Sequence, residues 1–437
     1  MSKANKQSLH LAASPVYLAA CAVNKVLCGL PRGTAYFIGV VLITMMTGQL
    51  MHHQGSLARA ALPYVIHLKW GWHRVERAMA RGHLCLDVLL EGAFQWCLLH
   101  LQVEPVMIGQ EHRSLYAIDS STIARLRSTR AGAVLGKGYS HLARRAVTAN
   151  IVACLTSVVT INGIRCGLVR RTRFAKTCPQ AVEAIFSELP QSEEKRLFTV
   201  DAGIATKDQF AAATAREALI GRLRSNVSLR RAPRPVKKRP VGRPRLHGAT
   251  LHPGRKRPES APDEDLLIQV ADRDVRLRRW RNLHFSGKAK TLIDVVRVDD
   301  PDFQRPLLIG TTARELTTEE IREAYRHRWP VETNFYVSQA TTAMDQPRAW
   351  ADASVMRRIS LALMTGSLLK AIAAQCEALP MGPWDLKAVA SAGRLANHLD
   401  AHAQEFAALS LKGIEIRKCR KKEGVNDSNN LQLSEAA

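Results

Sequence analysis

Residues 114–121 read Ser-Leu-Tyr-Ala-Ile-Asp-Ser-Ser, and residues 197–203 read Leu-Phe-Thr-Val-Asp-Ala-Gly. Each stretch contains an apolar run that ends in an aspartate, Asp119 or Asp201, and small residues follow each aspartate. A short apolar run bounded in this way predicts a buried β-strand. If the two strands are parallel neighbours, their carboxylates lie close together and repel each other unless a cation lies between them. The two stretches therefore predict a sheet with an acidic site at the ends of two strands.

A third stretch, residues 325–332, reads Tyr-Arg-His-Arg-Trp-Pro-Val-Glu. Tyr325, Arg328 and Glu332 stand at positions i, i+3 and i+7, which lie on one face of a helix. Carboxylate oxygens suit Mg²⁺ or Mn²⁺, so Asp119, Asp201 and Glu332 are candidate metal ligands. The plainer interpretation is that each aspartate is a turn residue or helix cap, and that the Tyr-Arg-Glu stripe is a solvated helix face.

The periodicity around these stretches predicts an α/β fold. The Asn162–Gly163 pair between two β-rich runs predicts a hairpin. Thr317 and Glu320 form a capping box for a helix that should run through Arg328, after which Pro330 either kinks the helix or opens a new one. Strands are expected at residues 114–118, 146–160, 163–171, 196–200, 219–224, 266–270, 275–285, 290–298 and 306–311. Helices are expected within residues 1–105 and at residues 179–189, 207–218, 352–380 and 384–409.

The chain is strongly basic. Its 437 residues include 63 Lys or Arg against 38 Asp or Glu, which gives a formal charge of +25. Such an excess indicates a polyanionic partner, and it favours nucleic acid over an anionic membrane surface. Nine cysteines without a C-x2-C pair exclude zinc-finger spacing and indicate reduced thiols in a cytosolic protein. The uncharged residues 33–51 could nearly span a bilayer, but their Thr and Gly content favours a buried helix.

The charge is concentrated between residues 222 and 258, which hold 13 Lys or Arg, six Pro and no acidic residue. A segment of this composition cannot pack a core and predicts an extended linker. Within it, Gly242, Arg243, Pro244 and Arg245 form a Gly-Arg-Pro-Arg motif that suits the narrow A·T minor groove. A solvated basic linker without a DNA role is the equally open alternative for Arg243 and Arg245.

The three stretches together resemble the DDE transposases of bacterial insertion sequences, in the group with a Y-x2-R-x3-E-x6-K signature. The resemblance covers roughly residues 110–345, and the stretch around Glu332 is its specific part. It implies an α/β, ribonuclease-H-like catalytic domain with a β-rich insertion, flanked by helical N- and C-terminal regions. The expected regions are 1–105 (helical, DNA-end binding), 106–226 with 313–350 (catalytic), 227–312 (basic linker and β-rich insertion), 351–411 (helical) and 412–437 (disordered tail).

The same resemblance implies roles for single residues. Asp119, Asp201 and Glu332 would be catalytic and would hold two Mg²⁺ or Mn²⁺ ions, with Asp119 shared between them. Tyr325 and Arg328 would contact DNA near the cut. Trp280 is the candidate for stacking on an extruded base, with a Trp packed on its own sheet as the alternative. Gln339 stands where the signature has a phosphate-binding lysine, which puts phosphate binding there in question.

The expected partner is therefore double-stranded DNA, meaning the terminal inverted repeats of the element and a target site. By the same resemblance the chain acts as a homodimer in the bacterial cytoplasm, associated with the nucleoid and not with a membrane. Three alternatives stay open. They are an inactive DNA-binding relic of a transposase, a ribonuclease-H-like nuclease without strand transfer, and a membrane-associated basic protein suggested only by residues 33–51.

Overall fold

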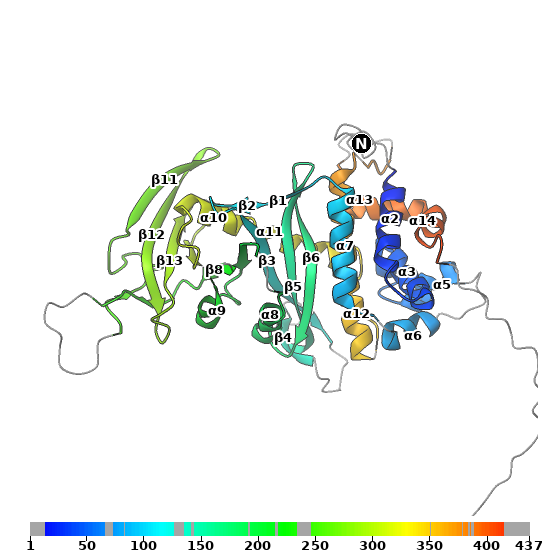
Figure 1. Ribbon diagram of the computed structural model, residues 1–437, viewed down its shortest axis with the longest axis horizontal. Coiled ribbons are helices and arrows are strands. Elements are labelled where there is room, and N and C mark those ends of the chain that lie inside the picture. The colour runs from blue at the N-terminus through cyan, green and yellow to red at the C-terminus, as the bar shows by residue number, and fades with distance from the viewer. Residues whose placement is uncertain are drawn as a thin grey trace, which may run out of the picture.

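The computed structural model describes residues 14–65, 73–82, 84–125, 135–140, 144–190, 193–214, 217–233, 246–349, 351–377, 379–382, 385 and 389–414. The fold is mixed α/β, as expected, and is built on one large sheet with helices on both faces (Figure 1). Arg243, Arg245 and most of the expected tail (residues 415–437) lie outside the described residues.

Five strands form the centre of the sheet in the order β6-β5-β3-β7-β8. β3 runs parallel to β7, and β7 runs parallel to β8, whereas β5 and β6 are antiparallel to their neighbours. β5, β7 and β8 are mostly buried, which explains their near-continuous apolar runs. Their bounds are Arg113–Ala124 (β3), Arg145–Ile161 (β5), Ile164–Ala175 (β6), Arg196–Val200 (β7) and Glu217–Leu223 (β8).

The expected hairpin between β5 and β6 is confirmed. Asn162 and Gly163 both have positive φ, of 47° and 76°, as a two-residue type I′ turn requires. One strand boundary was predicted wrongly, because β3 does not end at Ile118 but continues through Asp119 to Ala124. The extension exists because antiparallel pairing with β5 goes on after the parallel pairing with β7 has stopped. Asp201, in contrast, directly follows the last residue of β7 as expected.

The β-rich insertion does not form a separate sheet. β14 pairs with β8, and β13, β12 and β11 follow in antiparallel order, so the insertion extends the central sheet sideways (Figure 1). Its expected strands are confirmed at Glu264–Val270 (β11), Arg273–Phe285 (β12), Ile293–Asp299 (β13) and Leu307–Thr311 (β14). Short strands complete the sheet at Val103–Pro105 (β1), Met107–Ile108 (β2), Leu135–Ser140 (β4), Leu229–Arg230 (β9) and Thr250–Leu251 (β10).

The two faces of the sheet carry different helices. α8 (Cys178–Ser187) and α9 (Lys207–Ala212) pack on the face that includes Tyr116, Ile118 and Phe198. α10 (Thr318–Arg326), α11 (Trp329–Ala340) and α12 (Asp352–Gln375) pack on the other face, which includes Leu115, Ala117 and Leu197. The helix expected at residues 207–218 is shorter than predicted, because the chain leaves it at Ala213 in an extended conformation.

The helical regions at the two ends of the chain form one layer, not two separate domains. α12 lies against β6, α7, α6, α2 and α3, and α14 lies against α2, so a single apolar core joins residues 14–101 to residues 352–414. The helices fill one end of the molecule in Figure 1, on the side of β6 away from the insertion. Their bounds are Pro15–Leu27 (α2), Arg32–Met46 (α3), Gln49–His52 (α4), Leu57–Val65 (α5), His73–Arg81 (α6), Leu86–His100 (α7), Ala392–Ala401 (α13) and Ala403–Ser410 (α14).

The uncharged stretch at residues 33–51 belongs to this helical layer. α3 is almost entirely buried from Ala35 to Met46 within the apolar core, which confirms the buried-helix interpretation. Among the described residues, no helix combines the length and the apolar character needed to cross a bilayer.

Candidate active site

Strand register places Asp119 and Asp201 side by side. The last parallel pair between β3 and β7 is Ile118 with Val200, so the next residue on each strand is an aspartate. Side chains alternate between the faces of a strand, and Asp119 and Asp201 share the face of Leu115 and Leu197, which α10 and α11 cover. The predicted pair of neighbouring carboxylates is therefore present, at the end of the parallel ladder.

Three residues complete the site, namely Tyr325 near the end of α10, Arg328 between the two helices and Glu332 in the first turn of α11. The Arg328 guanidinium donates from Nη1 to Asp119 Oδ2 at 3.1 Å and from Nη2 to Glu332 Oε1. The Tyr325 hydroxyl donates to Asp201 Oδ1 at 3.3 Å. These contacts bring together five residues that the sequence singled out, namely Asp119, Asp201, Tyr325, Arg328 and Glu332.

The helical geometry expected for Tyr325, Arg328 and Glu332 is different from the observed one. α10 ends at Arg326, Arg328 is the residue before α11, and Pro330 sits in the first turn of α11. A proline is well placed there, because its missing N–H has no partner in a first turn anyway. The break between the helices, and not a single continuous face, allows Tyr325 to reach Asp201 while Arg328 reaches Asp119.

Burial and charge set the ionisation of this cluster. The pKa of Asp119 is raised to about 6, chiefly by burial and to a smaller extent by the nearby Asp201 and Glu332 carboxylates, against the lowering effects of Arg328 and the Ser120 N–H. Burial also raises the pKa of the Tyr325 hydroxyl to about 12, so it remains a hydrogen-bond donor at neutral pH. Arg328 lowers the pKa of Asp119 while the neighbouring carboxylates raise it, so Arg328 is the counter-ion of this acidic cluster.

The oxygen atoms of the site are of the kind that binds a hard divalent cation, but they are not arranged as a complete set of metal ligands. Asp119, Asp201 and Glu332 offer carboxylate oxygens of the kind that Mg²⁺ prefers. In the part of the chain that the structure describes, no three His, Cys, Asp or Glu side chains are grouped closely enough to hold a metal ion. Instead of a metal cation, the Arg328 guanidinium bonds to one oxygen each of Asp119 and Glu332.

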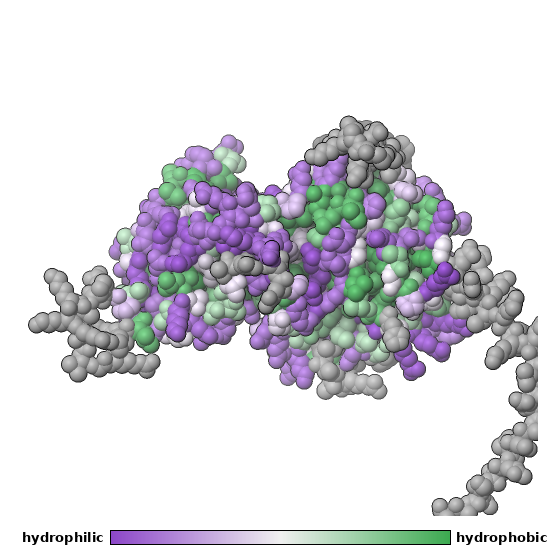
Figure 2. All heavy atoms as spheres, viewed as in Figure 1, coloured by the Kyte–Doolittle hydropathy of each residue, from purple (hydrophilic) through white to green (hydrophobic). Residues whose placement is uncertain are grey.

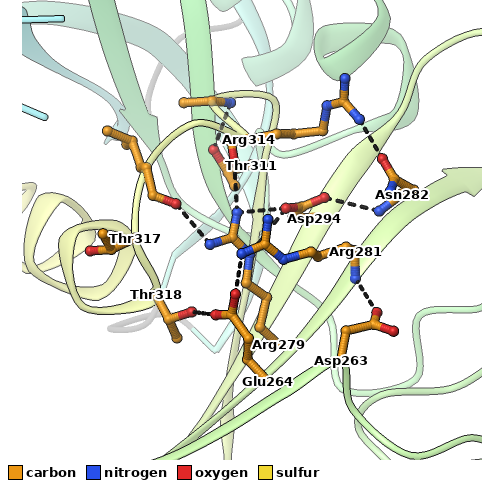
Figure 3. Close-up of polar contacts among 12 residues, drawn as sticks. Asp263, Glu264, Arg279, Arg281, Asn282, Asp294, Thr311, Arg314, Thr317 and Thr318 are labelled. Carbon is orange, nitrogen blue, oxygen red and sulfur yellow. Dashed lines mark hydrogen bonds and ion pairs between the residues drawn. The ribbon is translucent and has the colours of Figure 1, made fainter. Parts of the chain in front are cut away.

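The insertion holds the chain segment that leads into α10. The buried Arg279 guanidinium on β12 pairs with Asp294 on β13 at 2.6 Å and donates to the carbonyl oxygens of Arg314 and Leu316 at 2.9 and 2.7 Å. Figure 3 shows this group beside Thr318, the first residue of α10, whose hydroxyl donates to Glu264 on β11. Hydrogen bonds and an ion pair that involve β11, β12 and β13 therefore hold the start of α10, the helix that carries Tyr325.

Trp280 is not available for stacking on a base, and that expectation is corrected. Its indole is fully buried in the core formed with Leu283 and Val295, and its N–H donates to the Ser260 carbonyl at 3.1 Å. The alternating pattern of β12 turns Trp280 inward, and its arginine neighbours point elsewhere. Gln339 lies half-buried near the end of α11, two helical turns beyond Glu332.

The arginines of β12 are largely neutralised by acids of the neighbouring strands. Figure 2 shows the visible face of the insertion as mainly hydrophilic. This hydrophilic face is not an unbroken basic strip, because four arginines of β12 form ion pairs with acidic residues. The pairs are Arg276–Asp265, Arg278–Asp299, Arg281–Glu264 and Arg273–Asp300.

One site residue was missed by sequence reasoning. Arg222, near the end of β8, has a guanidinium nitrogen 3.9 Å from Asp201 Oδ1, and its side chain is 54% exposed. The available signal was its position near the end of a third expected strand, at residues 219–224. The strong basic content of residues 222–258 obscured that signal, because Arg222 was counted as the first residue of the linker.

The chain was compared with models of protein families and with curated proteins, and neither comparison gave a match.

Proposed function

We propose that this chain is a DNA transposase with a ribonuclease-H-like catalytic domain, and that it cleaves and joins DNA with two Mg²⁺ or Mn²⁺ ions. The observation that carries the proposal is the juxtaposition of Asp119, Asp201 and Glu332, which come from three separate parts of the sequence. Support comes from the strand order β6-β5-β3-β7-β8 with parallel β3, β7 and β8, which places Asp119 and Asp201 on neighbouring parallel strands. The strongly basic composition supports a nucleic-acid partner.

In this proposal the carboxylates of Asp119, Asp201 and Glu332 would hold the cations. When bound, the ions supply an activated water or 3′-hydroxyl and stabilise the leaving oxygen. The protonated Tyr325 hydroxyl orients the Asp201 carboxylate through its hydrogen bond. Arg328 balances the negative charge of Asp119 and Glu332 until cations take over that role.

The proposal extends to partners and place of action. The partner would be double-stranded DNA, both the terminal repeats of an insertion sequence and a target site. Two ends have to be cut together, so a homodimer is proposed for the active complex. The proposed place of action is the bacterial cytoplasm at the nucleoid.

The test uses DNA taken from immediately outside the coding region, where the ends of the element should lie. The full chain is incubated with this duplex and Mg²⁺ or Mn²⁺, beside Asp119→Asn and Glu332→Gln variants. Glu323→Gln serves as a matched control, because Glu323 is a half-exposed acid on α10 that pairs with Arg326 and His327. Cleavage by the wild type and the control alone is expected.

A second candidate, a DNA-binding relic without catalytic activity, is favoured by one residue. Gln339 lacks the charge of the lysine that the transposase signature carries at this position. Tight DNA binding with no cleavage in either metal would support the relic and overturn the enzyme. Gln339→Lys would then be the informative variant, because regained cleavage would locate the defect at that residue.

A further inference from the structure

Two guanidinium groups lie beside the carboxylates of the site, and they differ in their hydrogen bonds to those carboxylates and in their exposure to solvent. The Arg328 side chain is only 9% exposed, and its two terminal nitrogens are bonded to Asp119 and Glu332. Its remaining nitrogen, Nε, is also buried. Arg222 is 54% exposed, and within the described ranges the carboxylate that reaches it is Asp201, at 3.9 Å.

The position of Arg222 follows from strand register. Val200 on β7 pairs with Gly221 on β8, so the residue after each, Asp201 and Arg222, is placed side by side. Arg222 also pairs with Ile309 on β14, which fixes its backbone from the other side. Ala218 and Ile220 of β8 pack in the core that faces α10, and Arg222 continues this alternation on the same face. Asp119, Asp201 and Arg222 therefore form one row across three strands.

The distance between Arg222 and Asp201 leaves the N–H donors of the Arg222 guanidinium able to bind another group. A distance of 3.9 Å is too long for a hydrogen bond, whose N–H···O distance is about 2.7–3.2 Å. A guanidinium has five N–H donors in a fixed fork that matches two oxygens of a phosphate. The exposed Arg222 can offer these donors to solvent, whereas Arg328 would first have to release two carboxylates.

We propose that Arg222 binds a phosphate of the DNA strand at the Asp201 end of the row. Arg328 then serves as the internal partner of Asp119 and Glu332. This assignment rests on the proposed function, and it moves the phosphate contact from Arg328, where the sequence pattern puts it, to Arg222. The ligand class is a phosphodiester, recognised by charge and shape and not by base sequence.

The test measures binding of a fluorescent duplex, copied from the DNA beside the coding region, to the full chain at several salt concentrations without divalent metal. Loss of one phosphate contact is expected to make the slope of log affinity against log salt shallower by about 0.9. Arg222→Gln is therefore expected to bind about three- to tenfold more weakly near physiological salt. Arg222→Lys should keep the slope, because it keeps the charge, but should recover only part of the affinity.

The control is Lys412→Gln, which removes one positive charge from an exposed position just after α14, outside the regions expected to bind DNA. If Arg222→Gln keeps the wild-type affinity and slope, or weakens binding no more than Lys412→Gln does, the assignment of Arg222 is overturned while the proposed function stands. If the wild type itself shows no salt-dependent binding, the proposed function fails and the assignment fails with it. Circular dichroism of each variant checks that the fold is retained.

Discussion

At the scale of single residues, Asp119 is the most constrained group of the site. It is mostly buried, its Oδ1 accepts the Ser120 N–H at 2.7 Å, and its Oδ2 accepts from Arg328. Two further carboxylates lie near enough to raise its pKa. A carboxyl group in this environment is harder to ionise than in the unfolded chain. The difference appears in how the free energy of unfolding depends on pH.

Asp119→Asn is predicted to change how stability depends on pH. The pKa of Asp119 rises from 3.8 to about 6 on folding, so its contribution to stability is full below pH 3.8 and is lost as pH rises through about 6. The loss is on the order of 2–3 kcal/mol, at 1.36 kcal/mol per pKa unit. Asparagine cannot ionise, so the stability of the variant relative to wild type should increase between pH 4 and pH 7.5.

Urea unfolding of metal-free protein at each pH checks this prediction. Asp272→Asn, in the exposed turn between β11 and β12, is the control for a general effect of removing an acid. A stability difference between Asp119→Asn and wild type that stays constant over this range would show that Asp119 does not carry the pH dependence.

Residue spacing was sufficient to predict which acids meet, but not which side chains are accessible. Asp119, Asp201 and Glu332 could be predicted because an apolar run followed by an aspartate, and the spacing of Tyr325, Arg328 and Glu332, are visible in the local sequence. The burial of Trp280 depends on how β12 sits between β11 and β13, and no local pattern reports that packing. Arg222 becomes part of the site only through the register of β8 against β7, which is likewise a property of the assembled sheet.

At the scale of elements, the start of α10 is the best-marked boundary in the chain. The Thr317 hydroxyl accepts the Glu320 N–H at 3.2 Å, and the Glu320 carboxylate accepts the Thr317 N–H at 2.8 Å. Both halves of the predicted capping box are therefore formed. The ends of elements were harder to predict, since α9 stops at Ala212 and β3 continues beyond Asp119 for reasons of pairing and packing.

Thr317→Ala is predicted to destabilise the protein by about 1 kcal/mol, the usual effect of losing a helix N-cap. Glu320→Ala should also destabilise it, and the double variant should lose less than the sum, because the two bonds belong to one motif. Urea unfolding of the three proteins is the measurement. Strict additivity would show that the two halves of the box act independently, and an unchanged Thr317→Ala would show that the cap does not contribute.

At the scale of the whole molecule, the insertion strands and the strands β3, β7 and β8 form one sheet, joined at β8 and β14 and stabilised by Arg279. The ion pair between Arg279 and Asp294 is almost completely buried, at 0% and 2% exposure. Removing one partner of such a pair leaves an uncompensated buried charge. The brace also satisfies the carbonyl oxygens of Arg314 and Leu316, so its loss should loosen the entry to α10.

Arg279→Met is predicted to destabilise the protein by about 3–5 kcal/mol. Arg276→Met is the matched control, because Arg276 lies on the same strand and its pair with Asp265 is solvent-exposed, so its loss should destabilise the protein far less than the loss of Arg279. Denaturant unfolding compares the two variants. Equal losses would mean that the buried pair does not brace the insertion against α10.

The shared core between the two ends of the chain leads to the last prediction. α7 packs on β6 and α12, and α2 and α3 also lie against α12, so these three helices cover apolar surface that belongs to the rest of the fold. A chain that lacks residues 1–105 is therefore expected to expose this surface and to aggregate or bind the dye ANS, because apolar patches of that kind are rare on monomeric proteins. Adding residues 1–105 as a separate chain during expression should reduce both effects. Size-exclusion chromatography and dye fluorescence are the measurements. A monomeric shortened chain with one sharp unfolding transition would instead mean that the N-terminal helices are an independent domain, as the sequence pattern alone suggested.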